Sequence, residues 1–120
     1  MNDCIFCKIV KGEIPANKVY KDDKFLAFLD INPLSPGHTL VIPKDHYRFV
    51  WDVPNAGEYF EVTKKIAKAQ QKAFGTDVIW SKIMGDEVFH AHIWVFPHAK
   101  LAQGDKTDFA KNAEKISQNL

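Results

Sequence analysis

One long segment with helical periodicity, residues 56–74, constrains the fold of this 120-residue chain more than any other feature. Apolar side chains recur there every three or four residues, which is the period of an α-helix with one buried face. Pro54 and Asn55 precede the segment and can begin a helix, and Gly75 follows it as a C-terminal cap. The sequence therefore predicts one long helix over residues 56–74.

Short apolar runs on both sides of this helix predict strands, because they are rich in β-branched and aromatic residues. These runs are residues 19–20, 25–29, 38–42, 78–80 and 89–96. The polar break at 21–24 predicts a hairpin, although it lacks glycine. Shorter helices are expected at 4–11, ending at Gly12, and after Thr107 and Asp108. This order of elements predicts an α+β fold with a mainly antiparallel sheet.

Length, composition and charge narrow the class of protein. The chain suits a single domain over residues 1–120, and its 46% apolar and 26% charged residues are typical of a soluble globular protein. A net charge of +1 and the lack of a basic stripe argue against a nucleic-acid partner. No apolar run approaches the roughly 18 residues that span a bilayer, and the first residues lack the pattern of a secretory signal. We therefore expect a cytoplasmic protein with no membrane partner.

Two of the histidines lie two positions apart in the segment FHAHIWVF. If this segment is a strand, His90, His92 and Trp94 share one face. The opposite, apolar face would then consist of Phe89, Ala91, Ile93 and Val95. Aligned imidazoles are typical of a metal or phosphate site, but surface histidines on a half-exposed strand would give the same pattern.

Cys4 and Cys7 form a C-x-x-C motif with three possible meanings. A thioredoxin-like redox pair would follow a strand, and no strand is predicted before Cys4. The pair could instead be half of a tetrahedral zinc site that His46 and His90 complete. A pair without metal is the third possibility. One pair of cysteines cannot serve as a disulfide scaffold.

Several segments, in this order, resemble the histidine-triad (HIT) superfamily: IFCKIVKGEIPA, FLDINP, GHTLVIPK and GDEVFHAHIWVFP. The likeness runs from Cys4 to about Pro97 and implies a five-stranded antiparallel sheet with one long helix and short terminal helices. It also implies a homodimer that forms through the long helix and a sheet edge. The implied activity is that of a hydrolase or nucleotidyl transferase that binds a purine, AMP-like nucleotide. It would cleave nucleoside phosphoramidates or dinucleoside polyphosphates at the α-phosphate.

The resemblance implies a role for each matching position. His92 would be the nucleophile that forms a nucleotidyl-histidine intermediate, His38 would help to orient it, and Asp30 would bind the ribose hydroxyls. The other expected substrate-binding residues are Ile5, Phe6, Ile9, Phe28, Ile31, Leu40, Gly85 and Trp94. Members with this C-x-x-C resemble zinc-bound forms, which implies a structural zinc. Its expected ligands are Cys4, Cys7, His46 and His90.

The phosphate side departs from the family pattern. Trp94 takes the place of the third histidine, and Asp86 and Glu87 replace a glutamine and a hydroxyl residue. An expected asparagine is absent, and Ser81 lies near its position. Tryptophan retains an N–H donor but cannot carry charge. The alternative function is therefore a catalytically weak nucleotide-binding HIT module that acts as a sensor or partner protein.

Overall fold

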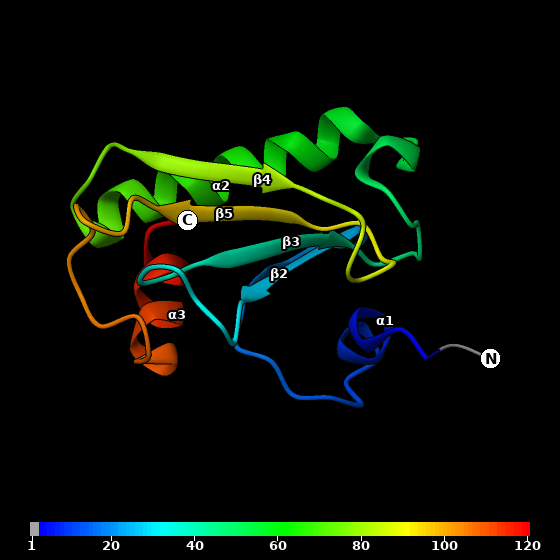
Figure 1. Ribbon diagram of the computed structural model, residues 1–120, viewed down its shortest axis with the longest axis horizontal. Helices are drawn as coiled ribbons and strands as arrows, with labels where there is room; N and C mark the ends of the chain where they lie inside the picture. The colour runs from blue at the N-terminus through cyan, green and yellow to red at the C-terminus, as the bar shows by residue number, and fades with distance from the viewer. Residues whose placement is uncertain (1–2) are drawn as a thin grey trace.

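A computed structural model describes residues 3–120 and has the predicted α+β architecture (Figure 1). The strands are β1 (Lys18–Lys21), β2 (Phe25–Leu29), β3 (Thr39–Pro43), β4 (Ile79–Ile83) and β5 (Ile93–Pro97). The helices are α1 (Ile5–Val10), α2 (Ala56–Phe74) and α3 (Phe109–Gln118), with a short 3-10 turn η1 at Val50–Asp52. The predicted helix over residues 56–74 is confirmed, and Gly75 ends it with a φ of 68°.

The strands form one antiparallel sheet in the order β1-β2-β3-β5-β4. The predicted hairpin joins β1 to β2 without glycine because hydrogen bonds to the Asp22 carboxylate stabilise the turn. Its Oδ1 accepts hydrogen bonds from the backbone N–H groups of Lys24 and Phe25, both at 2.8 Å. β5 lies between β3 and β4, so β4 is an edge strand (Figure 1).

Helices α2 and α3 cover one face of the sheet and form the larger core with it. Polar side chains within this core bond to the strands: the Tyr59 hydroxyl donates to the Val41 carbonyl at 2.6 Å. The Gln70 amide donates to the carbonyls of Gly37 and Val95, both at 2.9 Å. These bonds fix α2 at one register on β3 and β5.

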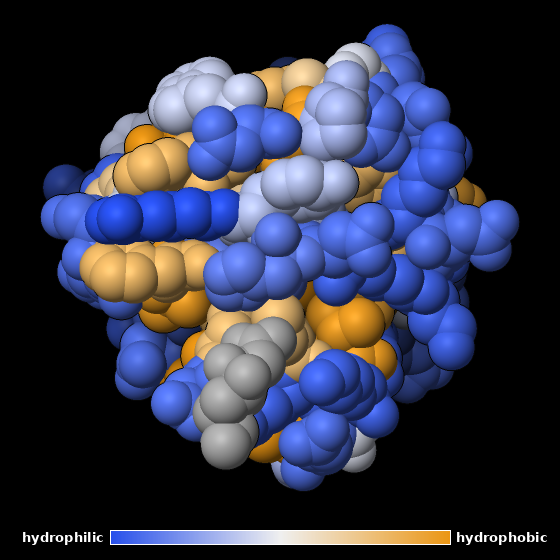
Figure 2. Space-filling view, turned by 90° about the vertical axis from the view of Figure 1, so that its right-hand side faces the viewer, coloured by the Kyte–Doolittle hydropathy of each residue, from blue (hydrophilic) through white to orange (hydrophobic). Residues whose placement is uncertain are grey.

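Helix α1 packs on the opposite face, where it forms a second apolar cluster with β2 and β3. Figure 1 shows α1 well separated from α2. Figure 2 views the end of the molecule where the chain enters α1, and shows a mostly hydrophilic surface broken by small apolar patches. Within residues 3–120, no helix is both long and apolar enough to cross a membrane.

Two strand predictions require correction. The strand expected at 78–80 is β4, which extends to Ile83, and the strand expected at 89–96 begins only at Ile93. The ladder stops there because Pro43, which lacks an N–H, ends β3, and the Ala91 N–H instead donates to the Tyr47 carbonyl at 2.6 Å. The prediction that His90 and His92 lie side by side on a strand is therefore wrong. Phe89 is also 52% exposed rather than part of the core.

Candidate functional site

A cavity of about 380 Å³ opens between α1 and the strand face that α1 covers. Its apolar walls come from α1 and from β2 and β3, and its polar groups lie before β1, just after β2 and in the segment before β5. The residues predicted for the site that line it are Ile5, Phe6, Ile9, Phe28, Asp30, Ile31, Leu40, His92 and Trp94. The structure therefore brings together nearly all of the substrate-binding positions that the resemblance implied.

Gly85 is a predicted site residue that does not line this cavity. It packs against an aromatic ring instead, because a Cβ at this position would lie 2.5 Å from Cδ1 of Phe49. The lining includes residues that the sequence analysis did not assign, among them Asn17 and Asn32. Both lie in turns beside β1 and β2, and their only sequence signal is an amide side chain within a loop.

His92 is buried, and one backbone bond fixes its ring. Its Nδ1 lies 2.7 Å from the carbonyl oxygen of His90. A carbonyl only accepts, so Nδ1 carries the proton, and Nε2 of the neutral ring retains its lone pair. The Phe6 ring packs edge-on at 5.2 Å. In its neutral form the ring therefore has one lone pair, on Nε2, and His92 lines the cavity.

His38 lies at the start of β3 and is 1% exposed. Its Nδ1 accepts a hydrogen bond from the Leu34 N–H at 3.1 Å, so the neutral ring carries its proton on Nε2, 3.7 Å from Oδ2 of Asp30. Burial lowers the pKa of His38 to about 4, although Asp30 opposes this change. His38 packs against the ring of Trp94 at 5.0 Å. Within residues 3–120 it forms no hydrogen bond with His92, so its orienting role stays a prediction.

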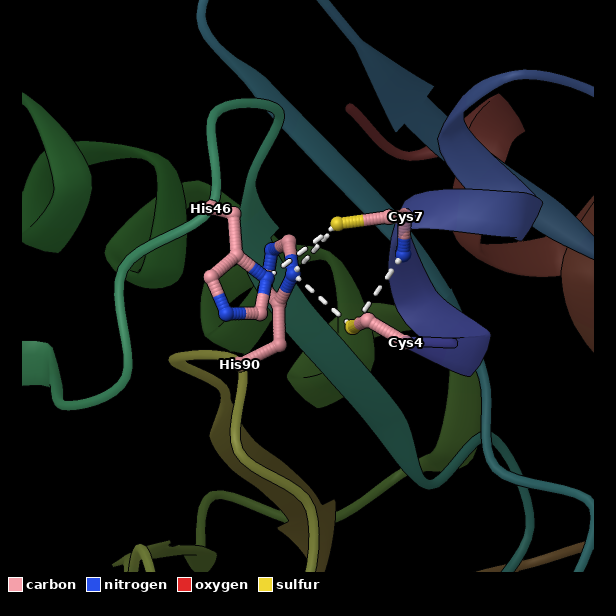
Figure 3. A group of neighbouring side chains, drawn as sticks. All are labelled: Cys4, Cys7, His46 and His90. Carbon is pink, nitrogen blue, oxygen red and sulfur yellow. Dashed lines mark hydrogen bonds between the residues drawn. The ribbon is translucent and has the colours of Figure 1, made fainter. Parts of the chain in front are cut away.

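Four side chains from three segments converge beside the cavity (Figure 3). They are Cys4 and Cys7 at the start of α1, His46 in the loop after β3, and His90 in the loop before β5. Their candidate ligand atoms all lie within 4.8 Å of one another. Nδ1 of His90 lies 3.3 Å from Sγ of Cys4, and Nδ1 of His46 lies 3.2 Å from Sγ of Cys7.

The donor chemistry of this cluster fits a zinc ion. Nε2 of His90 donates to the Pro43 carbonyl at 2.8 Å, which leaves the lone pair of Nδ1 directed at the two sulfurs. Burial lowers the pKa of His90, so this ring is neutral and ready to bind a metal. Two sulfur and two imidazole donors form a typical closed tetrahedral zinc set. This convergence favours the metal interpretation of the C-x-x-C over the redox interpretation.

Comparisons with known proteins agree with this geometry. Residues 11–101 match the HIT domain. A HIT-like protein of Borreliella burgdorferi is 46% identical over 139 residues and is aligned over the full length of both chains. The adenosine 5'-monophosphoramidase HNT1 of Saccharomyces cerevisiae is 38% identical, over 90% of this chain and 75% of its own. A zinc-bound histidine triad family protein from Mycobacterium smegmatis has a TM-score of 0.82 and 32% identity, over 98% of this chain and 92% of its own.

The fold and site define a class of α+β proteins in which a five-stranded antiparallel sheet carries a lined cavity beside a buried imidazole. Within that class, the chain belongs to the HIT family.

Proposed function

We propose that this protein is a nucleotide-binding hydrolase that cleaves nucleoside phosphoramidates, or related nucleotidyl bonds, at the α-phosphate. The observation that carries the proposal is the fixed tautomer of His92 at a cavity whose volume suits a small ligand. The name of the yeast relative, an adenosine 5'-monophosphoramidase, supports the choice of an AMP-like substrate.

The chemistry follows from the two ends of the His92 ring. Nε2 attacks the α-phosphorus, the bond from phosphorus to the leaving amine breaks, and the amine departs with a proton taken from solvent. The resulting nucleotidyl-imidazole carries positive charge, which the Nδ1 bond to the His90 carbonyl stabilises. Water then attacks phosphorus, the bond from phosphorus to Nε2 breaks, and the nucleoside monophosphate and one proton are released to solvent, which restores the neutral ring.

Asp30 is proposed to bind the ribose. Its Oδ1 accepts a hydrogen bond from the Asn32 N–H at 2.8 Å, which holds the carboxylate at the cavity. A carboxylate accepts from two adjacent hydroxyls, and the apolar walls from α1 and β2 suit a base. His38 would support this placement through its contacts with Asp30 and Trp94.

The four-residue cluster is proposed to hold one structural zinc. Two thiolates and two neutral imidazoles would balance the charge of the ion and leave no open coordination position. The zinc would tie the start of α1 to the loops that follow β3 and precede β5, and so would hold one wall of the cavity in place. The zinc-bound structural relative supports this proposal.

A homodimer is proposed through the edge strand β4 and helix α2. Trp80 on β4 is 48% exposed and Phe60 on α2 is 43% exposed, so each of the two elements carries an exposed aromatic side chain that a partner subunit could cover. Light scattering coupled to size-exclusion chromatography would test the dimer.

Replacement of His92 by Asn tests the hydrolase proposal. We expect the loss of adenosine phosphoramidate cleavage by about a thousandfold or more, with AMP binding still measurable, because only the nucleophile is removed. The matched control is His98→Asn, since His98 does not line the cavity. Chromatography of released AMP gives the rate. Turnover by His92→Asn at the wild-type rate would contradict the proposal.

Glu87 and Trp94 at the cavity favour the second candidate, a nucleotide-binding module with little turnover. In that case the wild-type protein would bind AMP but release none from the phosphoramidate.

A further inference from the structure

The cavity presents negative charge to a ligand that would itself be negative. Asp30 and Glu87 both line it, and among residues 3–120 no lysine or arginine does. A nucleotide that places its phosphate beside His92 therefore meets no lysine or arginine in the lining, and a cation from outside it would offset the repulsion.

The sheet register places such a cation next to Trp94. Phe28 pairs with Leu40, Leu40 pairs with Trp94, and Trp94 pairs with Lys82 on the edge strand β4. Directly paired residues project to the same face of a sheet, so Lys82 continues the row that forms the cavity floor. Its Nζ lies 5.6 Å from the centre of the Trp94 ring. The positive charge of Lys82 also contributes to the lowered pKa of His38, whose ring packs against that of Trp94 at 5.0 Å.

Both Lys82 and Trp94 have polar groups that the described protein does not use. Lys82 forms no ion pair within residues 3–120, whereas Lys24, also exposed, pairs with Glu58 at 2.9 Å. The Trp94 indole N–H likewise donates to no acceptor in the part of the chain that the structure describes. A lysine side chain is flexible, and its three donors can turn toward a phosphate.

We propose that Lys82 is the phosphate-binding cation of this site, and that the Trp94 ring guides its ammonium group to the phosphate of a bound nucleotide. The inference rests on the proposed function, because it assumes that the cavity takes a nucleotide. It explains how a cavity with two carboxylates admits an anion: the charge comes from the neighbouring edge strand.

A lysine on an edge strand has a simpler use, which is to keep chains other than the proposed dimer partner from pairing with that strand. Lys21 on β1 provides the matched control, because it is an exposed lysine on the opposite edge strand and does not line the cavity. If Lys82 only protects its edge, Lys82→Met and Lys21→Met should leave nucleotide binding equally unaffected.

The experiment compares the affinities of AMP and adenosine by titration calorimetry for the wild type, Lys82→Met, Lys82→Arg and Lys21→Met. We expect Lys82→Met to weaken AMP binding by roughly five- to tenfold and to leave adenosine binding unchanged, since one charge-assisted contact to phosphate is lost. Lys82→Arg should retain most of the AMP affinity, and Lys21→Met all of it. Added salt should weaken AMP binding more in the wild type than in Lys82→Met.

The outcomes separate a failure of the Lys82 assignment from a failure of the proposed function. Unchanged AMP affinity in Lys82→Met, or equal losses for AMP and adenosine, would overturn the assignment of Lys82 and leave the proposed function standing. A wild-type protein that binds neither ligand would overturn the proposed function and the Lys82 assignment with it. Thermal unfolding of each variant shows whether a loss reflects the fold, and Lys82→Arg provides the readout if Lys82→Met is unstable.

Discussion

His90 and His92 lie two residues apart, yet they belong to regions of opposite character. Each ring donates to a backbone carbonyl, but from a different nitrogen: Nε2 of His90 bonds to Pro43, and Nδ1 of His92 bonds to His90. The lone pair of His90 therefore lies at Nδ1, among the sulfurs of Cys4 and Cys7, and that of His92 lies at Nε2. The backbone bond thus decides which nitrogen of each imidazole keeps its lone pair, and this difference underlies the separate roles that we propose for the two residues.

The two regions also differ in how completely the protein satisfies their polar groups. In the cluster, four donor atoms face one another, which suits a closed structural site. Beside the cavity, Nε2 of His38 is buried and has no hydrogen-bond partner within residues 3–120, and the carboxylates of Asp30 and Glu87 line the cavity itself. If the cluster serves stability and the cavity serves binding, as we propose, variants in each region should separate these two roles.

The largest effect is expected from Cys7→Ser in the cluster. A ligand that binds only the folded state stabilises it, so loss of zinc should cost about 4 kcal/mol or more and lower the melting temperature by about 10 °C or more. Calorimetry and metal analysis measure both quantities. A chelator should destabilise the wild type and leave Cys7→Ser unaffected. A wild-type protein with almost no metal and no response to chelator would contradict the zinc site.

His38, which contacts the cavity residues Asp30 and Trp94, should make the free energy of unfolding depend on pH. Its pKa falls from 6.5 to about 4 on folding, so between these values the unfolded chain binds more protons. The free energy of unfolding therefore holds the full contribution of neutral His38 above about pH 6.5. It should fall by up to about 3 kcal/mol as the pH drops toward 4. Urea unfolding of the wild type and His38→Gln at several pH values measures this loss. The variant should lose less over that window, and identical pH profiles would contradict the prediction.

Asp30→Asn should affect binding but not the cluster. An amide accepts from two ribose hydroxyls less well than a carboxylate, so adenosine affinity should fall about tenfold, with zinc content unchanged. Asp23→Asn, in the exposed β1–β2 turn, is the matched control. Calorimetric titration with adenosine and with 2'-deoxyadenosine measures the effect. Asp30→Asn should discriminate less between the two ligands than the wild type does, and unchanged affinity for both would refute the ribose contact.

The smallest effect concerns two neighbouring carboxylates that the sequence could not tell apart. Glu87 lines the cavity and Asp86 does not, although both are exposed. Removal of one exposed charge is worth less than about 1 kcal/mol, so Glu87→Gln should strengthen AMP binding by about two- to threefold, with adenosine as the uncharged reference. Asp86→Asn should leave AMP binding unchanged. Equal effects of the two substitutions on AMP affinity would contradict the prediction that only Glu87 opposes the bound phosphate.

Much of the molecule follows from local patterns in the sequence. The helix over residues 56–74, its end at Gly75 and the glycine-free hairpin at Asp22 depend on periodicity and turn chemistry within a few residues. The set of four candidate zinc ligands and most of the cavity lining came from the resemblance to the HIT superfamily, and the structure brings both sets together.

Tertiary pairing decided the remainder. The alternation in FHAHIWVF predicted a strand from Phe89, but the β3–β5 ladder stops at the pair of Val41 and Ile93, and the two histidines bond to separate backbone carbonyls. Register likewise separates two neighbours on β4. Ser81 pairs with Val95 and lies on the α2 face, whereas Lys82 pairs with Trp94 and lies on the cavity face. A one-residue shift in register would exchange these faces, and only the hydrogen-bonded ladder between strands distant in sequence sets the register. The sequence by itself thus determined which side chains are present and which local elements form, while long-range hydrogen bonds decided which face and which nitrogen each site would use.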